Sequence, residues 1–266
     1  MSVITKKSGQ LEYLTAQEIS APHCFTTRLG GVSEGAFASM NIAIKEGERE
    51  EHVRKNLEIL GQAIGFSTND LVLTRQTHSD IIRVVTREDH REIFHRDYPE
   101  CDGLVTKDPG VALMIFTADC TPILLHDPVT GAVGAAHGGW RGTAAAIGSR
   151  LVEAMVENFG SRPEDLRAAI GPNIGMCCFE TDADVPEAIL AQYGAEAEPF
   201  IRRVGEKFYL DLKQINALSL KRMGVTHIDI SCDCTKCSPH RYWSHRLTGN
   251  ARGSQGAIIV CKEGSK

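Results

Sequence analysis

A cysteine and a histidine lie in one short stretch whose pattern brings them together. In FTADCTPILLHDPVTGAVGAAHGGWRG (116–142), two apolar runs flank the turn signal DPVTG at 127–131. Asp first and Pro second suit a type I turn. A pivot on Pro128 and Val129 places Cys120 opposite His137, and a bulge at Gly131 would shift the pairing by one residue. Opposed side chains have Cβ atoms about 4.5–5.5 Å apart. We expect either two ligands of one metal ion or a thiol beside its base.

The neighbours of this pair also suit a reactive site. Asp119 and Trp140 flank it, and the glycines of GGWRG allow close backbone approach before a helix N-terminus that favours anions. Asp119 is a candidate for proton transfer or, equally, a structural residue of the turn. A buried cysteine and a core histidine that meet by chance are the alternative interpretation.

A metal ion requires at least one more ligand, and His78 is the best candidate. It ends LVLTRQTH, at the close of an expected strand just before a turn. Catalytic zinc commonly has three protein ligands and an open position, and His, Cys and His form an acceptable set. Spacing alone leaves His90, His95 and His126 as competitors.

The elements that must position these residues alternate between strands and helices. Glycine-rich TTRLGGVSEG (26–35) predicts a loop. Apolar residues at helical spacing predict helices over about 48–64, 143–159 and 211–223. Residues 71–85 predict two strands pivoting at Ser79 and Asp80. Further strands are expected at 103–106, 111–116, within 161–175, at 225–231 and at 256–261. The tight turns favour a mixed or antiparallel sheet over a doubly wound one.

Bulk properties limit the classes of function. The chain has 266 residues, 42% of them hydrophobic and 24% charged, with a net charge of −5. This composition predicts one compact domain over 1–266, with its core at about 20–262, and argues against a dedicated nucleic-acid binder. We see neither a signal peptide nor an apolar run that could span a membrane, so we expect a cytoplasmic protein. Nine cysteines, an odd number, fit reduced thiols better than disulfides.

Several motifs occur in the order found in one known family. They are TRLGGVSEG, SMN (39–41), QTH (76–78), CDGLVT (101–106), TADCTPILLHD, AAHGGWRGT, AIGPNIGMCCFE and CT (234–235). The chain resembles the YfiH/YlmD-like proteins, also labelled laccase-domain or multicopper polyphenol oxidase proteins, from about Thr26 to Ile259. TADC and HGGWRG are the most specific motifs. The resemblance implies an α/β fold of four layers, α/β/β/α, with mixed sheets. It also implies zinc bound by His78, Cys120 and His137.

The resemblance implies purine nucleoside chemistry as well. Expected reactions are phosphorolysis of adenosine, inosine and methylthioadenosine, together with adenosine deamination, in which zinc would activate the attacking water. Purine nucleosides and phosphate are then the partners. Copper would be a substitute metal, as an older label, copper-dependent polyphenol oxidase, suggests. Editing of peptidoglycan precursors is linked to some bacterial members.

Substrate-binding residues are candidates from their chemistry and their place in the motifs. Arg28 and Arg141 are candidates for holding phosphate while the ribose develops oxocarbenium character, and we take Arg141, with Asp119, as a catalytic candidate. Asn41 and Gln76 are candidate hydrogen-bond partners for ribose or base. The carboxy-terminal match is looser: it offers the pocket candidates Ser244 and Arg246 and leaves Arg252 displaced from the expected glycine pairing.

Other chemistries compete with this interpretation. A multicopper oxidase needs several copper sites with paired histidine motifs, and the ten histidines include no His-x-His. A Cys120–His137 hydrolase dyad is permitted, although His78 favours a metal. A non-enzymatic scaffold is disfavoured by the polar residues around TADC. SCDCTKCSPHRYWSH (231–245) raises a further possibility, a second zinc held among Cys232, Cys234, Cys237, His240 and His245.

Overall fold

Two six-stranded sheets form the centre of the molecule. The computed structural model describes residues 3–95 and 97–262. The first sheet has the order β1 (Val3–Ser8), β2 (Leu11–Ala16), β3 (His23–Thr26), β15 (Gln255–Val260), β7 (Ala112–Thr117) and β4 (Leu71–Val72). The second has the order β14 (His227–Ile230), β10 (Arg167–Ile170), β8 (Thr121–His126), β9 (Val133–Gly138), β6 (Gly103–Thr106) and β5 (Ile82–Val84).

Both sheets are mixed, as the tight turns predicted. In the first, every pair is antiparallel except β7 with β4. In the second, β10–β14 and β5–β6 are parallel and the central pairs are antiparallel. A small third sheet contains β11 (Glu180–Thr181), β13 (Lys207–Leu210) and β12 (Ile201–Val204).

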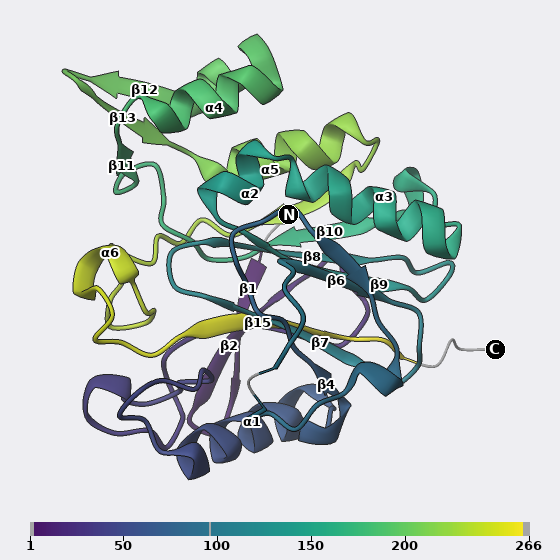
Figure 1. The fold of residues 1–266 in the computed structure, drawn as a ribbon. Helices are drawn as coiled ribbons and strands as arrows, with labels where there is room; N and C mark the ends of the chain where they lie inside the picture. The colour runs from purple at the N-terminus through teal and green to yellow at the C-terminus, as the bar shows by residue number, and fades with distance from the viewer. Residues whose placement is uncertain (1–2, 96, 263–266) are drawn as a thin grey trace.

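Helices cover the outer faces of the two large sheets. Figure 1 shows α1 (Glu50–Ile64) below the first sheet, and α3 (Ile147–Phe159) and α5 (Leu212–Arg222) above the second. The other α-helices are α2 (Trp140–Ala144), α4 (Asp184–Tyr193) and α6 (His245–Thr248). Short 3₁₀ helices cover Gly35–Phe37, Thr68–Asp70, Arg87–Asp89, Pro163–Asp165 and Gly194–Phe200. None of the described helices is long and apolar enough to cross a membrane.

Alternation along the strands produces the four layers. In β7, Leu113 and Ile115 pack between the sheets, while Ala112 and Met114 pack with the α1 side chains. In β8, Leu124 faces the other sheet and its two neighbours face α3 and α5. Successive strand side chains point to opposite faces, so a strand buried on both faces must be apolar throughout. This explains the unbroken runs of the sequence and confirms the expected α/β/β/α layering.

Two predicted elements differ from those observed. The helix expected over 143–159 is divided: α2 ends at Ala144, Ala146 is left-handed with φ of 59°, and α3 begins at Ile147. Ala144 and Ala146 pack with α4 and α5, whereas Ile147 packs against the second sheet, so one straight helix cannot serve both clusters. The two strands expected in 71–85 exist but are shorter, and they belong to different sheets.

Candidate active site

The hairpin of β8 and β9 brings Cys120 to His137 with a register different from the predicted one. Pro122, not Cys120, lies opposite His137. The turn is longer than a two-residue pivot, because the Asp127 N–H donates to the Ala132 carbonyl at 2.9 Å. Cys120 therefore precedes β8 and is a diagonal neighbour of His137 on the same face, a separation that long side chains still bridge.

Three side chains converge at the end of this hairpin. The ligand atoms of His78, Cys120 and His137 all lie within 4.8 Å of one another. His78 comes from the loop between β4 and β5; its Nε2 is 3.8 Å from the Cys120 Sγ, and its ring meets the His137 ring edge-on at 4.9 Å between centroids. The competing histidines His90, His95 and His126 are outside this group.

Glycines of HGGWRG make room for the loop that carries His78. A Cβ atom at Gly139 would lie 2.5 Å from the His78 ring, and one at Gly142 would lie 2.9 Å from the Ser79 carbonyl oxygen. Any larger residue would displace the imidazole. These glycines are therefore needed because two backbone segments approach closely at the cluster.

A fully buried carboxylate, Asp102, holds two of the three side chains in place. Its Oδ1 accepts hydrogen bonds from the His137 Nδ1 at 2.8 Å and the His78 backbone N–H at 3.0 Å. Its Oδ2 accepts from the N–H groups of Thr77 and Ser79 and from the Ser79 hydroxyl. These bonds stabilise the left-handed backbone of His78, whose φ is 62°. They also leave the His137 Nε2 free to bind a metal, the arrangement expected for a metal-binding histidine.

The cluster is electrostatically polarised. Burial raises the pKa of the Cys120 thiol, but the charges and hydrogen bonds of His137 and His78 outweigh it and lower the pKa to about 6. Burial lowers the pKa of His137, but Cys120 and Asp102 outweigh it and raise the pKa to about 9. Burial also opposes ionisation of Asp102, yet bonds from His137 and Ser79 hold the pKa of that carboxyl well below its usual range. The site therefore favours a thiolate, the form that binds a metal.

Asp119 lies beside Cys120 with its carboxylate fully engaged. Its Oδ1 accepts from the Thr235 hydroxyl at 2.5 Å, and its Oδ2 accepts from the Ser244 hydroxyl at 3.0 Å and the Arg246 N–H at 2.6 Å. Its backbone is left-handed, with φ of 86°. Residues in such strained conformations persist only where the surroundings hold them. These three hydrogen bonds fix Asp119, so it can position its neighbour Cys120.

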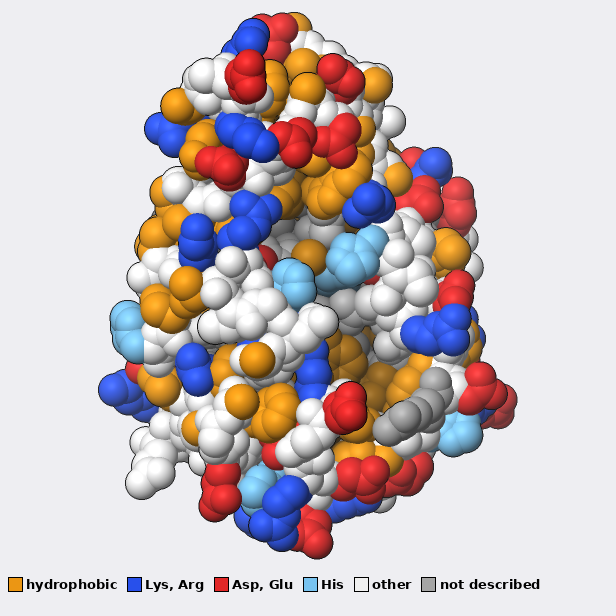
Figure 2. Space-filling view, turned by 60° about the vertical axis from the view of Figure 1, so that its left-hand side comes forward, with side chains coloured by type: hydrophobic (Ala, Val, Ile, Leu, Met, Phe, Trp, Pro, Cys, Tyr) orange, Lys and Arg blue, Asp and Glu red, His pale blue; other side chains and the backbone are white. Residues whose placement is uncertain are grey.

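The cluster opens into a cavity of about 390 Å³. Figure 2 shows a hollow on this face with histidine side chains in it and basic side chains around it. Apolar side chains form much of the wall, among them Phe116, Trp140, Ile174, Phe179 and Leu212. Its polar lining includes Gln76, Asp119, Arg141, His245, Arg246 and Arg252. Pockets of this size and composition hold small organic ligands.

The three arginines that line the cavity differ in what their guanidinium groups contact. Arg141 lies over the Trp140 ring at 4.2 Å, and Arg246 lies over the Phe179 ring at 5.6 Å. Arg252 donates from Nη1 to the Gly253 carbonyl at 2.8 Å, while its buried Nε has no hydrogen-bond partner among the described residues. Desolvation lowers the pKa of the Arg252 guanidinium below its ordinary value.

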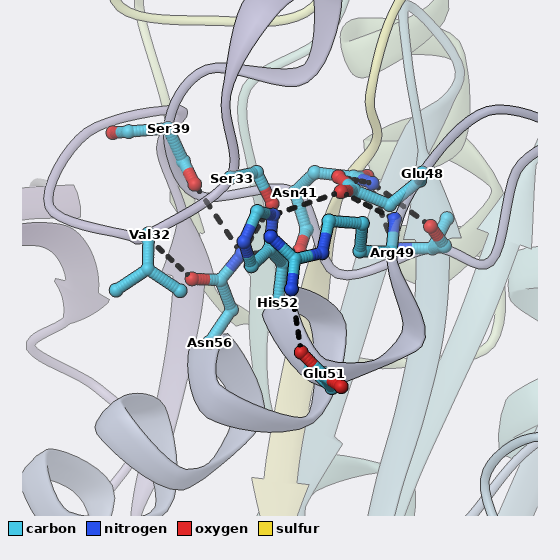
Figure 3. Close-up of polar contacts among 10 residues, drawn as sticks. Val32, Ser33, Ser39, Asn41, Glu48, Arg49, Glu51, His52 and Asn56 are labelled. Atoms are coloured by element: carbon cyan, nitrogen blue, oxygen red, sulfur yellow. Dashed lines mark hydrogen bonds and ion pairs between the residues drawn. The ribbon is translucent and has the colours of Figure 1, made fainter.

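Two predicted substrate residues lie away from this cavity. The Arg28 guanidinium donates to the carbonyls of Ala38 and Pro239 and stacks on the Trp243 ring at 3.8 Å, so its donors serve the fold. Asn41 is fully buried, and its amide donates to Glu48 at 2.9 Å. Figure 3 shows Asn41 within a polar network that also includes Asn56. Asn56, in α1, also accepts from the Val32 N–H at 2.8 Å, so the glycine-rich loop is tied to α1 rather than directed at a ligand.

Two further predicted residues support the cavity wall. The Gln76 amide donates to the Phe116 carbonyl at 2.8 Å and accepts from the Phe116 N–H at 2.7 Å, so both its ends bind backbone. Ser244 lies behind Asp119 as one of its donors. Arg141 and Arg246, by contrast, line the cavity itself.

Four residues at the site carry signals in the sequence but were not predicted to belong to it. Asp102 belongs to the CDGLVT motif, and Thr235 belongs to the CT motif at 234–235. His245 and Arg252 lie in the looser carboxy-terminal match, and both line the cavity. An acidic residue directly before a buried strand, such as Asp102, is a signal that could have been used.

Comparison with known proteins identifies the family. A family model described as multi-copper polyphenol oxidoreductase laccase matches residues 22–262. The chain belongs to this family. A purine nucleoside phosphorylase of Deinococcus radiodurans is 39% identical over 254 residues, covering 94% of this chain and 92% of that protein. The purine nucleoside phosphorylase YlmD of Bacillus subtilis is 34% identical, covering 90% and 88% respectively.

Solved structures agree with the fold described above. The crystal structure of YlmD from Geobacillus stearothermophilus matches with a TM-score of 0.91 at 33% identity, covering 98% of this chain and all of that one. A Bacillus licheniformis protein named YfiH also gives a TM-score of 0.91, at 31% identity.

The oxidase description of the family and the geometry of the site disagree. Multicopper oxidases need several copper centres with many histidine ligands. In the described part of the chain, the side-chain groups able to hold a metal are the cluster in the cavity and a group made of cysteines alone. The donors present suit a single metal ion in the cavity.

Proposed function

We propose that this protein is a zinc-dependent purine nucleoside phosphorylase acting on adenosine, inosine and methylthioadenosine. The observation that carries the proposal is that one cavity is lined both by the His78–Cys120–His137 cluster and by three arginines. Phosphorolysis needs a nucleoside and an anionic nucleophile in one pocket, and these two groups of side chains suit the two substrates. The names of the relatives point to the same reaction.

Zinc fits the three donors. Tetrahedral zinc with bonds of about 2.3 Å to sulfur and about 2.05 Å to nitrogen separates those ligands by about 3.6 Å. The His78 Nε2 and Cys120 Sγ are 3.8 Å apart, so little movement is needed. Bound there, zinc would act as a Lewis acid and leave one coordination position for substrate or water. Copper would bind the same donors when supplied in excess.

Arginines supply the phosphate site in this proposal. Arg252 lines the cavity, and its buried Nε has no partner among the described residues, so its guanidinium is not fully engaged by the fold. Arg141 and Arg246 bring two more guanidinium groups, which bind phosphate through paired, charge-assisted hydrogen bonds. Held this way, phosphate would lie ready to attack the ribose carbon as the bond to the base breaks.

The apolar wall suits the purine base. Phe179 and Trp140 present rings to the cavity, and each already has an arginine over it. Aromatic and guanidinium faces stack on planar bases with little preference among them. The wall therefore accounts for binding of adenine and hypoxanthine nucleosides alike.

Adenosine deamination is the second reaction that we assign to this site. We also propose that the protein acts in the cytoplasm. Asp119 lines the cavity next to Cys120 and is the candidate for moving the proton, as predicted from the sequence. Its two carboxylate oxygens already accept three hydrogen bonds, so it would accept a proton only by releasing one of these donors. Ammonia release therefore depends on the same cavity but needs no phosphate.

A comparison of product formation with and without phosphate tests the proposal. Zinc-loaded enzyme is incubated with adenosine or inosine, and products are separated by chromatography. We expect free base and ribose 1-phosphate only when phosphate is present. Cys120→Ala should abolish both, and Cys232→Ala, which removes an exposed cysteine outside the cavity lining, should change neither.

Each other outcome identifies a different enzyme. Base released without phosphate indicates a hydrolase, and ammonia without base indicates a deaminase alone. A wild type that turns over no nucleoside contradicts the proposal and favours editing of peptidoglycan precursors. Activity retained in Cys120→Ala together with loss in His137→Ala would exclude the Cys–His dyad and the three-ligand site.

A further inference from the structure

Four cysteines from distant parts of the chain gather at a second place. Cys177 and Cys178 follow β10, whereas Cys234 and Cys237 follow β14. Their four sulfur atoms all lie within 4.8 Å of one another. The Cys237 Sγ is 3.6 Å from the Cys177 Sγ and 3.4 Å from the Cys178 Sγ. None of the four lines the cavity of the candidate active site.

Backbone contacts hold these two segments together. Asn173 and Cys234 form a parallel bridge, and the Thr235 N–H donates to the Asn173 carbonyl at 2.9 Å. The Gly175 N–H donates to the Cys234 Sγ at 3.2 Å. A Cβ atom at Gly175 would lie 3.3 Å from the Cys234 Cβ and 3.4 Å from the Cys177 Sγ, so glycine gives the sulfur atoms room. Proximity of the four thiols thus has a structural basis.

We propose that Cys177, Cys178, Cys234 and Cys237 bind a second metal ion, a structural zinc. Four thiolates with bonds of about 2.3 Å in a tetrahedron have sulfur atoms about 3.8 Å apart. The two measured separations are close to this value. Binding exchanges protons for the metal: four thiols release four protons to solvent as four Zn–S bonds form, and no oxidation takes place. The N–H of Gly175 stabilises the charge on one sulfur.

A disulfide accounts for the arrangement less well. It would need a sulfur–sulfur distance of about 2.05 Å and an oxidant, and it would leave two of the four thiols unexplained. A closed set of four cysteines is instead typical of structural zinc sites, which keep no open position for substrate.

This ligand set corrects the one expected from local spacing. Of the five residues considered at 232–245, only Cys234 and Cys237 belong to the group. Cys232 is exposed and its Sγ lies 3.9 Å from the Asp233 Oδ1, while His245 lines the cavity and His240 is outside the group. The missing partners come from AIGPNIGMCCFE, about sixty residues earlier, as the 59- and 60-residue separations of the sulfur pairs show.

The second metal would brace one wall of the cavity. Ile174, three residues before Cys177, lines the cavity and donates its N–H to the Asp119 carbonyl at 2.9 Å. Thr235 directly follows Cys234 and donates its hydroxyl to the Asp119 carboxylate. The metal would therefore fix two of the segments that hold Asp119, from a position outside the reaction site.

Metal content of the protein purified under reducing conditions without added metal is the direct test. We expect two zinc ions per chain, one for each group of ligands. Cys177→Ser/Cys237→Ser should retain one and melt at a lower temperature. Cys120→Ala should also retain one, and the exposed Cys232→Ser should retain both. Because the two sites vary separately, failure of the proposed function and failure of this inference give different patterns.

Cys120→Ala, which leaves the four cysteines intact, also decides the question, should the double variant fail to fold. Cobalt exchanged into Cys120→Ala should still give the intense thiolate-to-cobalt absorption of a tetrahedral four-sulfur site. Three results would overturn the proposal: one zinc per wild-type chain that is lost in Cys120→Ala, no such absorption, or a disulfide found by mass spectrometry after alkylation of the wild type.

Discussion

Two groups of side chains that could hold a metal ion lie near each other in this molecule and differ in composition and surroundings. The first mixes two histidines with one cysteine and lines a cavity. The second contains only cysteines and lies outside that cavity. A site with three protein ligands leaves a position for substrate, whereas four thiolates complete the coordination of zinc. The number of protein ligands therefore distinguishes a metal site that can accept substrate from one that can only stabilise the fold.

The contacts that hold the two groups in place also differ. The first group has a buried carboxylate behind it, because Asp102 binds both the His137 ring and the loop of His78. Such a partner fixes the ring orientation and increases the basicity of the ligand. The second group is held by backbone pairing between its segments. Substitutions at the first should change catalysis with little effect on folding, and substitutions at the second should do the reverse.

The largest effect is expected from Cys120→Ala. This change removes one of three ligands, and we expect loss of the catalytic zinc and a fall in kcat/KM of about a thousandfold or more, in line with the several kcal/mol a catalytic metal supplies. The melting temperature should change little. Phosphorolysis assays with zinc analysis and calorimetry measure all three, and a large loss of stability would remove the contrast between the two groups.

Asp102→Asn should weaken the first site without affecting the second. Both oxygens of Asp102 accept hydrogen bonds, so the amide NH₂ of asparagine must face a donor on one side. We expect about 10–100-fold weaker zinc binding, the usual cost of losing such a partner. Competition with a chelating dye measures the affinity. Asp108→Asn is the matched control, because Asp108 accepts from the Arg87 N–H at the surface.

Arg252→Ala should affect phosphate more than nucleoside. Loss of a charge-assisted hydrogen bond costs about 1.5–3 kcal/mol, so the apparent KM for phosphate should rise about tenfold or more. Initial rates at varied phosphate and saturating inosine measure it. Arg162→Ala provides the comparison, since the side chain of Arg162 is 67% exposed and pairs with Asp165. Equal effects on the KM for phosphate and for inosine would remove Arg252 from the phosphate site.

Much of the fold followed from local patterns. The helices expected at 48–64 and 211–223 appear as α1 and α5, with Asp211 accepting a hydrogen bond from the Gln214 N–H at the start of α5. Apolar periodicity and turn residues act over a few residues, so they can be read locally. The expected register failed at the turn after Asp127, which is longer than a two-residue turn. The helix expected over 143–159 failed at Ala146, where contacts with distant elements decide.

The candidate site, like the fold, was predictable where local patterns decide and not where distant contacts decide. His78, Cys120 and His137 do converge, although the predicted pairing was wrong in detail. Arg28 was predicted from its glycine-rich loop, but its place depends on Trp243, more than two hundred residues later in the chain. Cys177 could not be linked to Cys237 from spacing, because only the folded sheets bring those segments together. Cytoplasmic location and the proton-transfer role of Asp119 stay predictions.

Thr235→Val should have the smallest effect, and it concerns the link between the two groups. The buried hydroxyl joins the segment of Cys234 to the Asp119 Oδ1, which has no other hydrogen bond described. Valine keeps the shape but leaves a buried acceptor unpaired, at a cost of about 1–3 kcal/mol in the free energy of unfolding. Zinc content should stay unchanged, and kcat should fall only a few-fold because Ser244 and Arg246 still hold the other oxygen. Chemical denaturation and phosphorolysis rates measure these effects, and Thr235→Ser, which restores the hydroxyl, should recover both. If Thr235→Val instead loses the catalytic zinc, the two groups are not independent, because the bracing of Asp119 would then be a condition for binding metal at Cys120.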